Sequence, residues 1–148
     1  MVNGAGGFAL SGPVAESDPQ LWQRQLAINL TTAYLATREF VPLLRSARGA
    51  IVYFASEAVL PGGKAAGMAA YAAAKAGVVA LMRAVAQEER DNGVRANALA
   101  PGAIRTASNV QAMGDRESFI ERADVGAAVA YLCSDDARAI SGQVIPLS

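Results

Sequence analysis

The sequence contains no histidine among its 148 residues. This absence excludes Ser-His-Asp triads, Cys-His nucleophile pairs and the zinc sites that depend on histidine ligands. We therefore expect no metal site. Any acid–base chemistry in this protein must come from tyrosine, lysine, aspartate or glutamate side chains.

Cysteine and charged residues are also scarce. Cys133 is the only cysteine and cannot form an internal disulfide, and no secretory signal precedes the fold. No uninterrupted apolar run reaches the ~18 residues that a membrane-spanning helix needs. The 13 basic and 13 acidic side chains balance, which gives no electrostatic footprint for nucleic acid. We expect a cytoplasmic protein that binds neither membranes nor nucleic acid.

Apolar residues are abundant: they make up 53% of the chain, against 18% for charged residues. This composition and the chain length suit one domain, residues 1–148, of layered α/β structure. Apolar, β-rich runs alternate with amphipathic stretches, which predicts parallel strands joined by right-handed helical crossovers. The expected strands are 1–2, 50–55, 94–100 and 141–147, and the expected helices are 18–46, 69–92 and 125–133.

The stretch from residue 49 to residue 75 organises the rest of the chain. Its apolar strand ends at Ser56, and an Ala-rich helix then carries Tyr71 and Lys75, four residues apart on one face. We expect these side chains at the edge where open α/β sheets bind their ligands. A nearby ammonium lowers the pKa of a phenol, which is ~10 when free. Tyr71 could then exchange a proton with a carbonyl or an alcohol while Ser56 holds the oxygen.

The Tyr-Lys pair also has a plain structural interpretation. A lysine follows a tyrosine at this spacing in roughly one case in twenty by chance. Tyr71 would then be an aromatic residue on a helix face, and Lys75 its solvated neighbour. The strand-end Ser56 and three further motifs favour the catalytic interpretation.

The further motifs stand where other elements meet the same edge. Residues 3–6, Asn-Gly-Ala-Gly, form a turn of small residues after the first strand. Asn29 interrupts the apolar stripe of the first helix. It is either a structural residue that is hydrogen-bonded to the backbone or a functional residue. Residues 101–106, Pro-Gly-Ala-Ile-Arg-Thr, follow a strand, although Pro-Gly alone is a common turn.

Taken in order, these motifs resemble those of the short-chain dehydrogenase/reductase family, which binds NAD or NADP on a Rossmann-type fold. The resemblance implies a carbonyl–alcohol oxidoreductase similar to 3-oxoacyl reductases, with a small-molecule substrate. It also implies a partial Rossmann-type three-layer fold with a parallel sheet. The implied catalytic residues are Asn29, Ser56, Tyr71 and Lys75. The implied cofactor-binding residues are Asn3, Ala5, Gly6, Tyr71, Lys75, Pro101, Gly102, Ile104 and Thr106.

The family's Gly-rich phosphate loop, Thr-Gly-x-x-x-Gly-x-Gly, has no counterpart in this sequence. We therefore expect the C-terminal portion of a family member, with the first strands and helices missing and the preference between NAD and NADP unreadable. The strand at 50–55 would then expose an apolar edge, which favours pairing with another chain. We expect a homo-oligomer.

Two functions remain open on the sequence. The first is the NAD(P)-dependent oxidoreductase, with Ala107, Val110, Met113 and Phe119 as candidates for lining an apolar substrate pocket. The second is a truncated, non-catalytic oligomerisation or binding module that uses the two long helices as its interface. A serine hydrolase is disfavoured because the chain has no Gly-x-Ser-x-Gly elbow.

Overall fold

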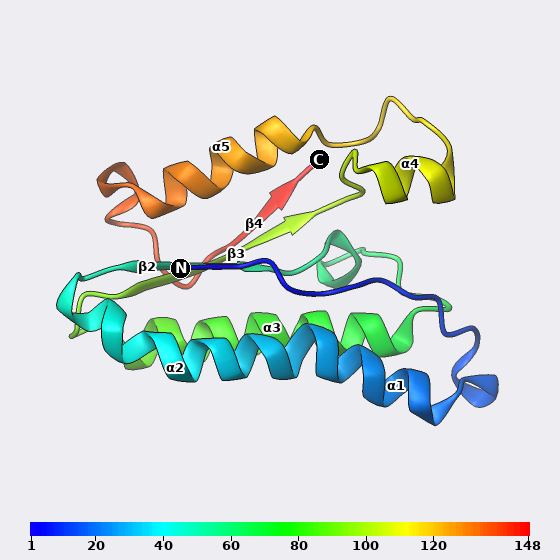
Figure 1. Ribbon diagram of the computed structural model, residues 1–148, viewed down its shortest axis with the longest axis horizontal. Coiled ribbons are helices and arrows are strands. Elements are labelled where there is room, and N and C mark those ends of the chain that lie inside the picture. Colours follow the sequence, from blue (N-terminus) through cyan, green and yellow to red (C-terminus); the bar gives the residue numbers. More distant parts are fainter.

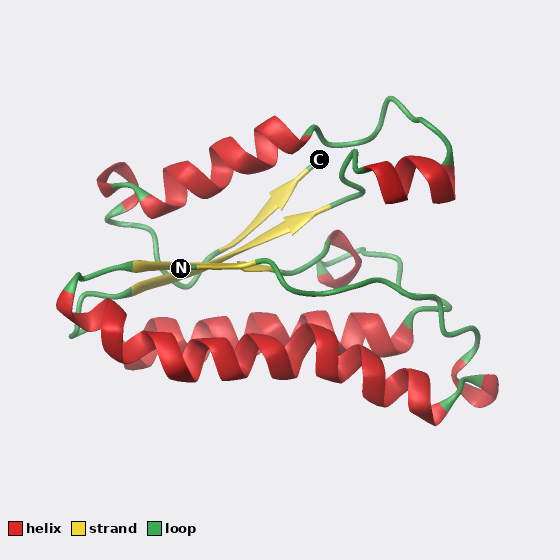
Figure 2. Ribbon diagram, viewed as in Figure 1, coloured by secondary structure: helices red, strands yellow, loops and turns green.

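The computed structural model describes all 148 residues and has the expected α/β architecture (Figure 1). A parallel four-stranded sheet of order β1-β2-β3-β4 lies between two layers of helices (Figure 2). The strands are β1 (Val2–Asn3), β2 (Ala50–Phe54), β3 (Arg95–Pro101) and β4 (Val144–Leu147). The helices are α1 (Pro19–Leu26), α2 (Thr32–Ser46), α3 (Ala69–Glu88), α4 (Ala107–Met113) and α5 (Arg122–Cys133). The prediction of a three-layer Rossmann-type arrangement is confirmed.

The central strand β2 is apolar throughout because both faces of the sheet are covered. Ile51 and Tyr53 lie in the larger core cluster, with side chains of α2 and α3. Val52 lies in a second cluster with Leu99 of β3 and Leu132 of α5. Successive side chains of a strand point to opposite faces, so a strand between two helical layers has no solvated position.

The first long helix covers the predicted range but is not regular. Asp18 caps α1 by accepting a hydrogen bond from the Gln20 N–H (2.8 Å), and Pro19 occupies the first turn. A π-helical turn, Ala27–Thr31, joins α1 to α2 and contains Asn29. Such turns widen a helix by one residue and are frequent at functional sites.

Helix α3 forms much of the core, with Val78, Met82 and Val85 packed in the larger cluster. By length and composition alone this helix is apolar enough to cross a membrane, contrary to the expectation drawn from uninterrupted apolar runs. Core helices pass the same test, which makes it weak support for a membrane span. The packing of α3 against the sheet accounts for its composition.

The C-terminal third departs from the predicted boundaries. Helix α4 lies in a segment that the sequence led us to expect as irregular. Helix α5 begins at Arg122, three residues before the expected start, with Glu121 at its cap and Asp124 in its first turn. Cys133, the last residue of α5, is exposed and does not pack inside the helix layer.

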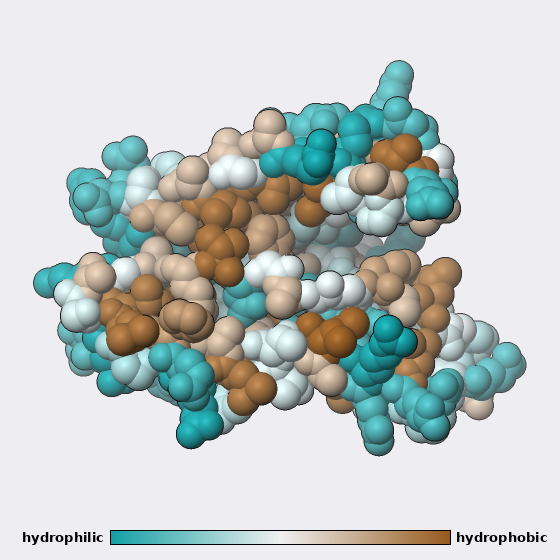
Figure 3. Space-filling model, in the orientation of Figure 1, coloured by the Kyte–Doolittle hydropathy of each residue, from teal (hydrophilic) through white to brown (hydrophobic).

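The first strand is as short as expected. β1 pairs with β2 only through Val2 opposite Val52 and Asn3 opposite Tyr53. Beyond these pairs that edge of β2 has no strand beside it. Figure 3 shows apolar side chains gathered between the two helical layers on this face of the molecule.

Candidate active site

Three predicted catalytic side chains meet at the carboxyl end of β2. The Lys75 ammonium donates a hydrogen bond to the Phe54 carbonyl oxygen (2.9 Å) and lies 5.8 Å from the centre of the Tyr71 ring. Ser56, two residues after β2 ends, is buried, and its Oγ accepts a hydrogen bond from the Ala58 N–H (3.3 Å). The four-residue spacing of Tyr71 and Lys75 places both on the first two turns of α3.

Asn29, the fourth predicted catalytic residue, lies buried on the other side of the same region. Its Nδ2 donates to the Gly7 carbonyl oxygen (2.9 Å), and its Oδ1 accepts from the Gly7 N–H (3.1 Å). The same Nδ2 also contacts the backbone oxygen and the Oε1 of Gln25, both at 3.1 Å. Asn29 therefore ties the helix to the turn that follows β1.

Burial dominates the electrostatics of the Tyr-Lys pair. It raises the pKa of the Tyr71 phenol, and the neighbouring Ser56 hydroxyl opposes that shift without cancelling it. Burial also lowers the pKa of the Lys75 ammonium to about 8. The expectation that Lys75 would bring the Tyr71 pKa below its ordinary value is therefore wrong for this arrangement of side chains, because desolvation of the phenol is the largest effect and only the Ser56 hydrogen bond opposes it.

These residues border a cavity of about 430 Å³ at the carboxyl ends of β2 and β3. The predicted site residues that line it are Gly6, Asn29, Tyr71, Lys75, Pro101, Gly102 and Ile104. Two widely separated loops, 4–8 and 101–104, thus face one another across the Tyr-Lys pair. This is the position at which open α/β sheets bind their ligands.

Comparison with known proteins agrees with this geometry. A family profile described as enoyl-(acyl carrier protein) reductase matches residues 1–148. The chain is 35% identical to 2-(S)-hydroxypropyl-CoM dehydrogenase 3 of Xanthobacter autotrophicus, over 96% of this chain and 61% of that protein. The structure of an oxidoreductase of the short-chain dehydrogenase/reductase family from Burkholderia thailandensis aligns with a TM-score of 0.86 and 31% identity, over 99% of this chain and 62% of that one. The chain belongs to the short-chain dehydrogenase/reductase family.

A second solved structure extends the comparison to a cofactor complex. A 3-oxoacyl-[acyl-carrier protein] reductase from Brucella melitensis, solved with bound NAD, aligns with a TM-score of 0.84 and 28% identity, over 99% of this chain and 59% of that one. The chain spans about three fifths of the length of the relatives it matches.

The turn that resembles the family's cofactor turn packs closely against Asn29 and Lys75. A Cβ atom added at Gly6 would lie 2.5 Å from Asn29 Oδ1 and 3.5 Å from Lys75 Nζ. Any side chain at this position would collide with Asn29, so the wall of the cavity here is backbone. Backbone of the glycines at 4, 6 and 7 and the loop at 101–104 border about 430 Å³ of space, a volume typical of a small-molecule site, and these residues could hold part of a nicotinamide cofactor.

Three predicted cofactor-binding residues of this short-chain dehydrogenase/reductase do not line the cavity. Asn3 is buried, and its Nδ2 donates to the Ala33 carbonyl oxygen (3.2 Å), which fastens β1 to α2. Ala5 is exposed on the turn. The Thr106 Oγ1 caps α4 by accepting from the Asn109 N–H (3.2 Å). Ser56 lies beside Tyr71 but also outside the cavity lining.

The sequence reasoning missed Phe8. Its ring meets the Tyr71 ring edge to face, with centroids 5.1 Å apart, and it lines the cavity while remaining 60% exposed. An aromatic residue directly after a turn of small residues was the available signal. Asn109, Arg122 and Val125 also line the cavity, whereas none of the four substrate-pocket candidates does. One of those candidates, Phe119, is instead buried under the Arg105 guanidinium, 5.5 Å from its ring centre.

Proposed function

We propose that this chain carries the catalytic residues of an NAD(P)-dependent oxidoreductase that interconverts a carbonyl and a secondary alcohol. The observation that carries the proposal is the half-buried Tyr71 beside the buried Lys75, both lining a cavity at the carboxyl ends of strands. One relative is named a 2-(S)-hydroxypropyl-CoM dehydrogenase and another a 3-oxoacyl-[acyl-carrier protein] reductase. These names support both alcohol oxidation and carbonyl reduction. The residues 1–148 act as one domain in this proposal.

The proton chemistry follows from the burial of Tyr71. Because burial raises the pKa of this phenol, the group is protonated at neutral pH and is ready to donate to a carbonyl oxygen. The Ser56 hydroxyl is hydrogen-bonded to the Tyr71 phenol, although Ser56 does not line the cavity, and it would hold the same oxygen beside that phenol. A bound nicotinamide supplies or accepts the hydride. For alcohol oxidation the direction reverses, and Tyr71 must first lose its proton.

Lys75 serves the phenol as a fixed positive charge. With a pKa of about 8, most Lys75 side chains carry a proton at pH 7. The ammonium stabilises the phenolate left after proton donation, and its bond to the Phe54 oxygen holds it in place. Asn29 acts in this account as a positioning residue, because its amide is engaged by Gly7 and Gln25.

The cofactor would be held by residues of two loops. Gly6 and the loop of Pro101, Gly102 and Ile104 would hold the nicotinamide portion, and Lys75, which lines the same cavity, would bind a ribose hydroxyl. Asn3, Ala5 and Thr106 would act indirectly, through the shape of the turn and the start of α4.

The alternative, a non-catalytic oligomerisation or binding module, is less well supported. It does not explain why a lysine is buried against a tyrosine at a cavity, a costly arrangement for a scaffold.

We also propose that the enzyme is a cytoplasmic homo-oligomer. Large apolar side chains are exposed along α1 and α2, and β2 has an uncovered edge. The exposed residues are Trp22, Tyr34, Leu35, Phe40 and Leu43. A monomer at every concentration in sedimentation would contradict the oligomer, and fractionation of the native cell would test the compartment.

Titration of NADH and NADPH into the chain, followed by nicotinamide fluorescence, tests the proposed cofactor site. We expect saturable binding that a Lys75→Met variant weakens, since the variant removes the charge near the ribose. Absence of binding up to about 1 mM would contradict the proposal for this chain.

A further inference from the structure

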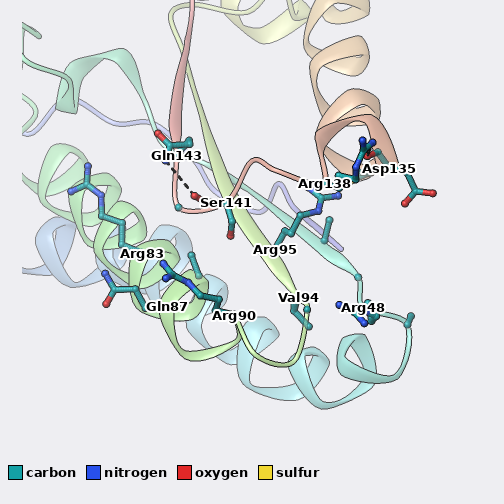
Figure 4. A pocket seen from close by; sticks show the side chains of 17 residues that line it. Arg48, Arg83, Gln87, Arg90, Val94, Arg95, Asp135, Arg138, Ser141 and Gln143 are labelled. Atoms are coloured by element: carbon teal, nitrogen blue, oxygen red, sulfur yellow. Dashed lines mark hydrogen bonds between the residues drawn. The ribbon is translucent and has the colours of Figure 1, made fainter.

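A second cavity, of about 940 Å³, lies at the opposite end of the sheet, where β2 and β3 begin (Figure 4). Its walls come from the turn after α2, the end of α3, the start of β3 and the segment after α5. The basic residues that line it are Arg48, Arg83, Arg90, Arg95 and Arg138. Only one carboxylate residue, Asp135, lines the same space. In a chain with 13 basic residues and no net charge, this is a strong local concentration of positive charge.

Most of this charge is not neutralised within the chain. Arg95 serves the fold, since its guanidinium donates to the carbonyl oxygens of Leu132 (2.8 Å) and Ser134 (3.0 Å). None of the four ion pairs in the structure includes any other arginine of this cavity. Arg48, Arg83 and Arg90 are exposed and available to an anion.

The number of these arginines and their positions on different walls favour an anion larger than one phosphate. Arg83 lies in α3 and Arg90 in the turn just after its end, seven residues further along the chain, with Gln87 between them (Figure 4). Arg48 approaches from the facing wall across Gly93, where an added Cβ would lie 2.7 Å from its Nε. One phosphate group has too few oxygen atoms to form paired hydrogen bonds with guanidinium groups on several walls of the cavity. An anion with several linked phosphates matches the number and positions of these groups.

We propose that this cavity binds an oligophosphate chain, either free or carried by a nucleotide. Guanidinium groups match the geometry of phosphate oxygens and bind them in pairs of hydrogen bonds. The cavity has the size of a small-molecule site. Tyr71 and Arg90 are 19 residues apart along α3 and its end, roughly 28 Å at the rise of a helix, so this site is separate from the proposed catalytic one.

Calorimetric titration with inorganic tripolyphosphate and with ATP, both without divalent cations, tests the proposal. We expect saturable one-to-one binding and a Kd at least tenfold higher in an Arg83→Gln/Arg90→Gln double variant, which loses two charge-assisted contacts. The matched control is Arg24→Gln/Arg38→Gln, which removes the same charge from exposed positions outside the cavity. Equal affinities for both probes indicate recognition of the phosphate chain alone, whereas tighter ATP binding indicates a nucleotide.

Cys133 offers a second readout, since it is the only cysteine, is exposed and lines this cavity. Tripolyphosphate should slow the alkylation of Cys133 by neutral iodoacetamide in the wild type and leave the rate unchanged in the Arg83/Arg90 variant. A Kd for tripolyphosphate above about 1 mM would overturn the proposal, and so would an equal loss of affinity in the control variant. An alkylation rate of Cys133 that tripolyphosphate does not change in the wild type would overturn it as well. Because NADH binding depends on the other cavity, its failure would not produce these results.

Discussion

Asn29 and Gly7 hold one another by two hydrogen bonds, one in each direction, between a π-helical turn and the loop after β1. This contact fixes the wall of the proposed catalytic cavity, because Gly7 and Gly6 both line it. The side chain thus acts across 22 residues of sequence.

Replacing Asn29 by alanine should destabilise the fold as well as the site. The change leaves the Gly7 N–H and carbonyl without side-chain partners in a poorly solvated place, at a cost of about 1–3 kcal/mol. Urea denaturation measures the loss. Gln23→Ala, on the exposed side of α1, is the control and should leave the stability unchanged. An Asn29→Ala protein as stable as the wild type would show that these bonds are dispensable.

Because of Lys75, the folded protein should become more stable as the pH rises through the mildly alkaline range. Its pKa is about 8 in the folded protein, and a lysine exposed on unfolding keeps its proton to ~10.4. Between these values the unfolded chain binds more protons, so raising the pH favours the folded state. Between pH 8 and pH 9.5, the free energy of unfolding of the wild type should therefore rise by up to about 2 kcal/mol relative to that of the Lys75→Met variant. Denaturation at several pH values measures this free energy for both proteins. The same dependence on pH in the wild type and in the variant would contradict the prediction.

Glu89 should also make the protein more stable as the pH rises, but in the acid range. Hydrogen bonds from Arg45, at 2.8 and 2.7 Å, lower the pKa of this carboxyl. Its contribution to stability is present above the unfolded pKa and is lost as the pH falls through the folded one. We expect Glu89→Gln to lower the melting temperature by about 2–4 °C at pH 7. The same difference persisting at pH 3 would exclude an ionic origin.

Phe8 should help to select the substrate. Its ring lines the cavity against Tyr71 and is exposed on its outer side, where an apolar substrate group can pack. Phe8→Ala should raise KM for an apolar ketone about three- to tenfold with a smaller change in kcat. Tyr131→Ala, an exposed aromatic outside the cavity, is the control. An unchanged KM would remove Phe8 from the substrate site.

Local patterns predicted most of the fold and half of the site. The apolar run of β2 and the four-residue spacing of Tyr71 and Lys75 depend on neighbouring residues only, so sequence reveals them. The π-helical turn at Asn29 and the contact of Phe8 with Tyr71 depend on packing between distant segments. The sign of the Tyr71 pKa shift was missed for the same reason, since desolvation depends on the whole surrounding fold.

The cavity lined by arginines could not be predicted from the sequence either, because it too depends on contacts between distant segments. A net charge of zero correctly describes the composition but not the distribution in space. Arg48 and Arg138 are 90 positions apart in the chain and line one cavity only because the strands β2 and β3 begin at the same edge.

The most direct test of the catalytic account is the rate of NAD(P)H-dependent ketone reduction by a Tyr71→Phe variant. The substitution removes only the phenolic oxygen, so the ring contact with Phe8 and the binding of NADH should persist. We expect kcat to fall at least a hundredfold, the usual contribution of a general acid. Turnover by Tyr71→Phe at the wild-type rate would contradict the assignment of Tyr71 as the proton donor, and with it the proposed mechanism.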